Sequence, residues 1–258
     1  MANCGEKNGF KVNGSFWPPA IQIGYVDSQE ANETGVCTET VNGVQVGTYN
    51  NFKDSFQGLQ IGLFNKGENV KGLSLGIVNA HERITGLHIG LWNYVRQEAR
   101  TIGIGLVNQS DGNLIGGHIG LFNQAGEIMQ GFQLSFANLV GAHNKTNYNI
   151  AMKGFQVSLA NSSVRNMSGL QIGMFNVAEF MMDGVQIAIF NAGGSIVGGM
   201  NDGLHIGIFN SSANMNGRTI GILNFSGQCK YFTPLTGSSC LFGPAEKPYV
   251  TPVSDCCG

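Results

Sequence analysis

The stretch GLHIGLWN, residues 86–93, decides the fold, because the chain repeats it with small variations along most of its length. We number its positions one to eight; the consensus is glycine, apolar, glutamine, apolar, glycine, apolar, apolar, asparagine. Successive complete copies end 14 or 15 residues apart, except for two spacings of 23 and 19 residues that indicate insertions. Spacing this regular is typical of an array in which each unit packs mainly on its neighbours. The complete copies end at Asn50, Asn65, Asn79, Asn93, Asn108, Asn123, Asn138, Asn161, Asn176, Asn191, Asn210 and Asn224, and a degenerate copy ends at Asp27.

The repeated phrase predicts a strand, because positions two, four and six are apolar in nearly every copy and this alternation has the period of a strand. We expect these side chains to share one face that is turned to the core. Glycine at position one and asparagine at position eight are expected to bound the strand as turn residues. The linkers carry nearly all the charge, so they should face water. They also hold apolar residues that could fill the same core, namely Val70, Ile84, Ile128 and Met182.

The sequence therefore predicts an all-β protein, a β-solenoid of about 13 short repeats of 14–15 residues each. Residues 1–42 would form an N-terminal cap with the degenerate first repeat, residues 43–224 the array, and residues 225–258 a Cys- and Pro-rich cap or arm. Eight extended residues span about 26 Å, and six or seven linker residues return only about 20–23 Å. A coil is then either one repeat bent at the position-five glycine or two repeats that form a flattened turn.

Stacked strands place like residues above one another. The asparagines at position eight could therefore satisfy their amides in a buried ladder, each bonding to the rungs above and below. Alternatively, each asparagine is present because it tolerates a left-handed turn conformation. The spacing leaves both interpretations open.

The other face of the strand carries the candidate binding site. Position three is Gln, His, Ser, Thr or Gly, position five is small, and position seven is often aromatic. If this face is open, the rings could stack on a glycan or a peptide. Alternatively, the rows belong to the core: Phe132 occurs with Ala137 and Phe155 with Ala160, a volume exchange which suggests that positions two and seven share one packed space. The candidate ligand-facing residues are Gln60, Phe64, His88, Trp92, His118 and Phe122.

Composition and motifs exclude several classes of function. Only 12 % of the 258 residues are charged and the net charge is −2, so nothing indicates a nucleic-acid-binding surface. No nucleotide loop, metalloprotease helix or nucleophile elbow occurs, and we expect no catalytic residue, metal or cofactor. His88 and His118 share position three with Gln, which argues for interchangeable hydrogen bonding rather than metal ligation. The alternatives are a glycan-active enzyme with a carboxylate pair in the linkers, or a membrane β-barrel with positions two, four and six towards lipid.

The cysteines are confined to the two ends of the chain. Their even number predicts disulfide-stapled caps in an oxidising compartment, and Cys4 with Cys37 is the natural N-terminal pair. The four C-terminal cysteines allow three pairings, and a zinc site is the weaker interpretation because paired C-x₂-C elements are missing. The start of the chain has no visible signal peptide, so the chain either is not exported by that route or has lost its signal. The six disulfide candidates are Cys4, Cys37, Cys229, Cys240, Cys256 and Cys257.

At GLQIGLFN, residues 58–65, and at GLHIGLWN, each followed by a short polar linker, the chain resembles a leptospiral-type bacterial surface-repeat family with tandem G-[LV]-Q-[IL]-G-[LI]-x-N phrases. The resemblance covers residues 43–224. It implies a secreted or surface-displayed bacterial protein without enzymatic activity, and it brings no catalytic residues. With the rows described above, we expect a binding, adhesion or structural module. Its partner would be a protein or glycan, or another copy bound through strand edges or the aromatic face.

Overall fold

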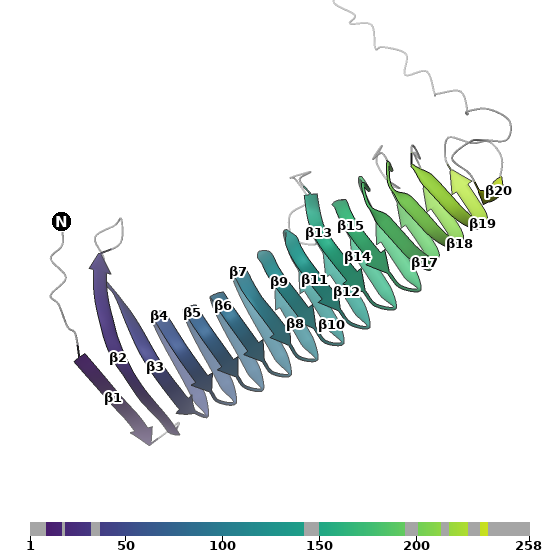
Figure 1. Ribbon diagram of the computed structural model, residues 1–258. Helices are drawn as coiled ribbons and strands as arrows, with labels where there is room; N and C mark the ends of the chain where they lie inside the picture. Colours follow the sequence, from purple (N-terminus) through teal and green to yellow (C-terminus); the bar gives the residue numbers. More distant parts are fainter. Residues whose placement is uncertain are drawn as a thin grey trace, which may run out of the picture.

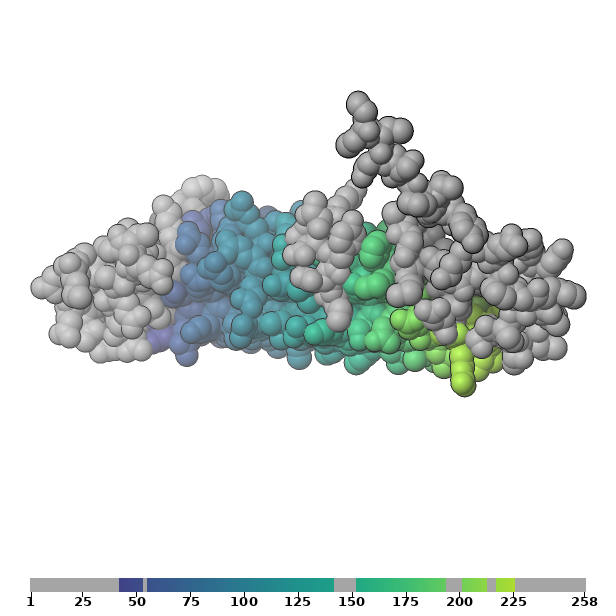
Figure 2. All heavy atoms as spheres, turned by 90° about the horizontal axis from the view of Figure 1, so that it is seen from above, coloured from purple at the N-terminus to yellow at the C-terminus, as the bar shows by residue number. Residues whose placement is uncertain are grey.

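The computed structural model is a single stack of β-coils (Figure 1). It describes residues 9–16, 19–31, 37–141, 150–193, 201–212, 217–226 and 233–236. In these ranges the regular structure consists of strands, and seen from above the coils follow one another along a straight rod (Figure 2). The protein is an all-β solenoid, which confirms the fold class expected from the repeat.

The strands fall into three groups according to where a coil is interrupted. The first group begins with β1 Gly9–Phe16 and then contains the longest strands, which are β2 Pro19–Ala31, β3 Cys37–Gly47, β4 Tyr49–Ile61, β5 Phe64–Leu75, β6 Val78–Ile89 and β7 Trp92–Ile104. In the second group each coil is divided into two strands, which are β8 Val107–Ser110, β9 Asn113–Ile119, β10 Phe122–Ala125, β11 Met129–Leu134, β12 Ala137–Val140, β13 Ile150–Val157, β14 Ala160–Ser163, β15 Asn166–Ile172 and β16 Phe175–Ala178. The last group comprises β17 Val185–Gly193, β18 Leu204–Ser212, β19 Arg218–Ser226 and β20 Thr233–Thr236.

Each coil contains one repeat. Between β5 and β6, Asn65 pairs with Asn79 and the parallel register continues to Leu75 with Ile89. The same register joins β3 to β4 near one end and β18 to β19 near the other. From β4 to β16 the strand stops after position four and resumes at position seven, so the chain turns at positions five and six. This is the coil of one repeat bent at position five.

The expected turn residues lie inside strands. Gly86, at position one, belongs to β6, and Asn93, at position eight, belongs to β7. Position one is glycine in every complete copy except the one that begins at Thr101, and Gly86 shows another reason for this: its φ is +137°, a value that other residues rarely adopt. A Cβ at Gly86 would also lie 2.0 Å from the carbonyl oxygen of Gly72 in the preceding coil. Glycine at position one therefore allows the coils to stack closely.

The prediction that positions two, four and six face the core is wrong. Ile61 and Leu63 are exposed, and Leu59 is half-buried. Four positions of each repeat lie in the interior. They are position three, position eight, the second residue after the asparagine and the second residue before the position-one glycine. Of the expected linker contributors, Val70, Ile84 and Met182 are buried, whereas Ile128 is half-buried and Met129 takes its place. The row of buried apolar residues from the linkers is Phe56, Val70, Ile84, Ala99, Leu114, Met129, Met152, Met167 and Met182.

Both ends of the stack change strand direction. β1 pairs with β2 and β2 with β3 in antiparallel fashion, and β20 pairs antiparallel to β19. The degenerate copy that ends at Asp27 lies in β2 and runs against its neighbour, with Ile23 opposite Val44. Cys37 begins β3, whereas Cys4, Cys229, Cys240, Cys256 and Cys257 lie outside the described residues. The predicted disulfide caps and domain limits therefore stay predictions.

Candidate functional site

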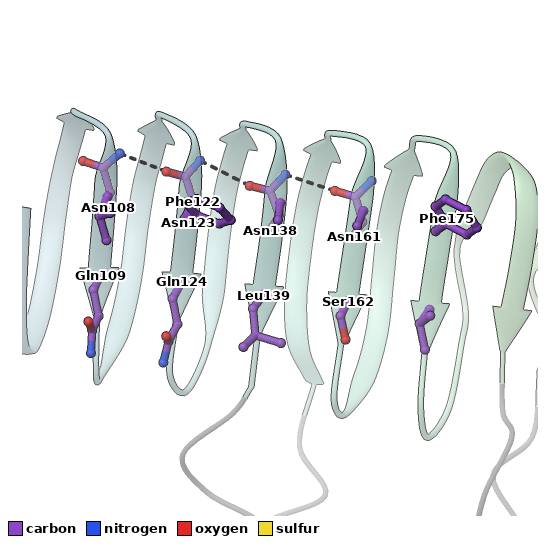
Figure 3. Close-up of a pocket in the computed structure, with 14 residues that line it drawn as sticks. Asn108, Gln109, Phe122, Asn123, Gln124, Asn138, Leu139, Asn161, Ser162 and Phe175 are labelled. Atoms are coloured by element: carbon purple, nitrogen blue, oxygen red, sulfur yellow. Dashed lines mark hydrogen bonds between the residues drawn. The ribbon is translucent and has the colours of Figure 1, made fainter. Parts of the chain in front are cut away.

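A ladder of asparagine side chains runs through the interior. The Nδ2 of Asn108 donates to the Oδ1 of Asn123 at 2.9 Å, and Asn123 donates in the same way to Asn138 at 3.2 Å (Figure 3). Bonds of this kind join every neighbouring pair of position-eight asparagines from Asn50 to Asn224. The ladder, one of the two roles considered for this asparagine, is the one that the structure shows.

The ladder also ties the turn to the strand. From Asn50 to Asn210, each asparagine also donates to the position-four carbonyl of the next coil; Asn93, for example, donates to Ile104 at 2.9 Å. Where position five is serine, the hydroxyl joins the ladder: Ser158 donates to Asn161 at 2.8 Å. Because buried amides that lack partners are costly, these bonds make asparagine the side chain that the turn requires.

The position-three row also lies inside the coil, but it is discontinuous. Gln171 donates to Gln156 at 2.8 Å, and Gln186 donates to Gln171 at 2.7 Å. These bonds point towards the N-terminus, opposite to those of the asparagine ladder. Between Gln60 and Gln133 the row contains Ser74, His88, Gly103 and His118.

The two histidines of this gap face each other across a rung without a side chain. Their ring centroids are 6.2 Å apart, and a Cβ at Gly103 would lie 2.4 Å from the Nε2 of His88. Within the described residues, neither ring nitrogen of His88 or His118 has a hydrogen-bond partner. The rings thus fill the space above and below Gly103, and this part of the row is held by packing.

Burial keeps the interior histidines neutral. Desolvation lowers the pKa of His118 to about 3 and that of His81 and His205 to about 4. Burial also lowers the pKa of His88 well below its ordinary value, with smaller contributions from His118 and His81. A neutral ring costs less to bury than an imidazolium, so all four are uncharged at neutral pH.

The structure divides the six candidate ligand-binding residues into two sets. Gln60, His88 and His118 are fully buried and cannot touch a ligand outside the coil. The three aromatic candidates lie on the outer surface, where Phe64 is 49 %, Trp92 50 % and Phe122 53 % exposed. The expectation that positions three and seven share a face is wrong, because the bend at positions five and six reverses the alternation.

The exposed rings belong to a surface that we call the short face. It consists of two rows of outward side chains, one at position seven and one at the residue after the position-eight asparagine. These rows lie on β8, β10, β12, β14 and β16 and on the equivalent residues of the longer strands. Phe190 stacks on Phe175 and on Phe209, with ring centroids 5.1 and 4.8 Å apart. Lys66 is the only charged side chain among the described residues of these two rows. The opposite surface, with positions two and four outward, is the long face.

A groove of about 420 Å³ interrupts the aromatic row on the short face. Its ends are Phe122 and Phe175, and position seven is Ala137 and Ala160 in the two coils between them (Figure 3). Gln109, Gln124, Leu139, Ser162 and Val177 line the side of the groove. The signal for this groove in the sequence was the paired exchange of volume between positions two and seven.

The linker carboxylates take part in surface contacts. Glu82 pairs with Arg96 at 3.1 Å, and Glu98 pairs with Arg100 at 2.8 Å. In the part of the chain that the structure describes, no three His, Cys, Asp or Glu side chains come together in a way that could hold a metal ion. The described residues also contain no helix long and apolar enough to span a membrane. The fold and this surface define a β-solenoid repeat protein, and no family model, curated protein or solved structure matches the chain.

Proposed function

We propose that the chain is a non-enzymatic repeat protein, secreted or displayed at a cell surface, whose solenoid is a scaffold for binding or adhesion. The short face is its binding surface. The resemblance of residues 43–224 to bacterial surface repeats supports the location, and the interior ladders support the scaffold role, because they fix the outward rows in a regular array.

The exposure of the short face is the observation that carries the proposal. Twelve coils spaced about 4.8 Å apart, with strands of four residues, give a face of roughly 700–800 Å². Its position-seven row is apolar or aromatic throughout, and Phe64, Phe175 and Phe190 in this row are 40–49 % exposed. Soluble monomers rarely expose a continuous apolar patch larger than a few hundred Å², and larger patches usually mark interaction sites. An aromatic surface with so little charge fits an apolar protein partner or the faces of sugar rings.

The polar contacts of the linkers support a role without catalysis. Asp111 accepts hydrogen bonds from Gln109, at 2.8 Å, and from Tyr94. The hydrogen bond from Tyr94 to Asp111 is the main reason that the pKa of this tyrosine rises to about 12. Tyr94 with Asp111 and Arg96 with Glu82 join neighbouring linkers, whereas Glu98 pairs with Arg100 within its own linker.

A pair of matched variants tests the proposal. F64T/W92T/F122T removes three rings from the short face, and I61T/I89T/I119T removes three exposed apolar side chains from the long face. Binding of the purified full chain to immobilised extracellular-matrix proteins and to a glycan array is measured for both. We expect the parent to bind one of these classes, the short-face variant to bind at least about tenfold more weakly, and the control within about threefold of the parent. Equal losses in both variants, or a parent that binds neither class, would contradict the proposal.

A further inference from the structure

We infer that the short face binds the long face of a second copy of this chain, through a two-coil ridge that enters the two-coil groove. This inference rests on the proposed function of the short face and names its partner. It begins from a pair of rings on the long face. Phe132 and Phe155 are in register on β11 and β13, and their rings stack with centroids 5.6 Å apart and planes at 14°.

This pair forms a ridge at position two, where most other coils have a smaller aliphatic residue. Phe155 is 40 % exposed, whereas Phe132 is half-buried, because its ring covers Gly117 in the preceding coil. The ridge spans two coils, and Ala137 and Ala160 make the groove two coils wide. Ridge and groove therefore have the same width along the axis.

The ridge and the groove also lie in the same two coils. Phe132 and Ala137 belong to the repeat that ends at Asn138, and Phe155 and Ala160 to the repeat that ends at Asn161. A second copy with its axis parallel can then place its ridge in the groove with an axial shift of no more than one coil. Across one coil, position two lies opposite the residue after the asparagine, which is two residues beyond position seven. The second copy must therefore move along the strand direction by about two residues, or roughly 7 Å, to bring its position two over position seven.

The correlated volumes of positions two and seven follow from this arrangement. Within one chain the two positions are on opposite outer faces, so they cannot share a packed space. Between two copies they do share one, and a large residue on one side then requires a small one on the other. Such exchange of volume across a contact is how well-packed interfaces reach the density of protein interiors.

Charge and area favour a second copy over other partners. The groove has no charged lining residue, and the ring pair that enters it is apolar. Lys153, beside the ridge, would lie opposite Ser162 rather than a cation. A contact of roughly 700–800 Å² per copy matches the usual size of a stable protein interface. Because the two surfaces differ, a pair of copies retains one free ridge and one free groove, and the assembly grows as an open row.

Two variants based on sibling repeats test this inference. A137F/A160F fills the groove with the residue that position seven has in neighbouring coils, and F132L/F155L lowers the ridge to the common leucine. Both preserve the repeat pattern, and circular dichroism with thermal melting checks that they fold like the parent. Sedimentation velocity of the full chain over a range of concentrations gives the oligomeric state.

We expect the parent to form species that grow with concentration, each variant alone to be monomeric, and an equimolar mixture to form a one-to-one dimer. The dimer forms because one variant retains the ridge and the other the groove. A monomeric parent, association of either variant at the parent's level, or a mixture that stays monomeric would overturn the inference. A monomeric parent that binds neutral phosphatidylcholine vesicles would also overturn it and assign the face to lipid. Both variants keep Phe64 and Trp92, so their binding to matrix proteins and glycans tests the proposed function separately.

Discussion

The two interior rows of amides lie in the same narrow coil, yet they differ in continuity. The asparagine ladder passes through twelve coils without a substitution, whereas the position-three row changes from Gln to Ser, His and Gly and back to Gln. The difference lies in the backbone. Each asparagine from Asn50 to Asn210 bonds both to its neighbour and to a position-four carbonyl, as Asn65 does with Leu75 at 2.8 Å. At position three the glutamines bond mainly to one another. A whole section of this row can therefore consist of other residues that fill the interior by packing and form no hydrogen bonds along the row.

Low pH should destabilise the chain through the histidines of the position-three row, and this is the largest effect that we expect. Unfolded histidine has its ordinary pKa of 6.5, whereas His118 and His205 have pKa values of about 3 and 4 in the folded chain. The unfolded state therefore binds more protons below pH 6.5, and stability falls as the pH drops towards 4. At about 1.4 kcal/mol per pKa unit, each histidine contributes a loss on the order of 3 kcal/mol.

Urea unfolding of the parent and of H88Q/H118Q/H205Q at pH 7, 5.5 and 4 measures this loss. All other side chains are the same in both proteins, so the difference between the two curves isolates the three replaced rings. The triple variant should lose several kcal/mol less than the parent. Parallel curves would show that these rings are not buried in neutral form.

Breaking the asparagine ladder should have the next largest effect. Asn161 accepts hydrogen bonds from Asn138 and Ser158 and donates to Ile172 and Asn176. Asn161→Ala leaves these four groups without their partner inside the coil, and we expect a loss of about 4 kcal/mol in the free energy of unfolding. Ser162→Ala, on the outward side of the same strand, is the control and should change stability by less than about 0.5 kcal/mol. Equal effects would mean that the ladder is dispensable.

The glutamine row should be less sensitive than the ladder. Gln171 has two bonds along the row, to Gln156 and from Gln186, so Gln171→Ala should cost about 2–3 kcal/mol by urea unfolding. Gln171→His, which other coils have at this position, should cost about 1 kcal/mol. If alanine at Gln171 costs as much as alanine at Asn161, the contrast between the two rows is wrong.

The smallest effect is a gain from extending the glutamine row. The Nε2 of Gln133 has no hydrogen-bond partner among the described residues, and it faces the coil of His118. His118→Gln supplies an acceptor and should raise the free energy of unfolding by about 1 kcal/mol. His88→Gln is the matched control, because Gly103 separates it from the glutamine row; thermal or urea unfolding should show a smaller gain. A loss at His118, or an equal gain at both sites, would contradict this prediction.

The repeat predicted the solenoid correctly, because its spacing is a property of the whole chain. It also suggested the asparagine ladder and the linker residues Val70 and Ile84 in the core. The prediction of which strand face points to the core was wrong, because an alternation with period two separates two faces but does not say which one lies inside. Here the bonds of Asn at position eight decide, because they require the amides to lie inside the turn.

The exposure of the candidate binding residues was predicted in part for the same reason, and their role in binding stays a prediction. The rings Phe64, Trp92 and Phe122 are exposed as a binding surface requires, but Gln60 was grouped with them on the assumption of one continuous strand. A bend at positions five and six reverses the alternation between positions three and seven, and a sequence pattern alone does not contain that reversal. The volume exchange between Phe132 and Ala137 was visible, yet its meaning depended on knowing that both side chains point outward.

Because each coil contains one repeat, the number of repeats sets the length of the rod. Every ladder bond joins coils that are adjacent, so removing residues 109–123 would join Asn108 to Gln124 and bring Asn108 next to Asn138. The rod would shorten by about 4.8 Å, one strand spacing, and the two coils that flank the deletion would stack on each other as the other coils do. The distance between the two ends is thus counted in copies of an eight-residue phrase, and recombination between copies in the gene can reset it without altering the contacts inside a coil.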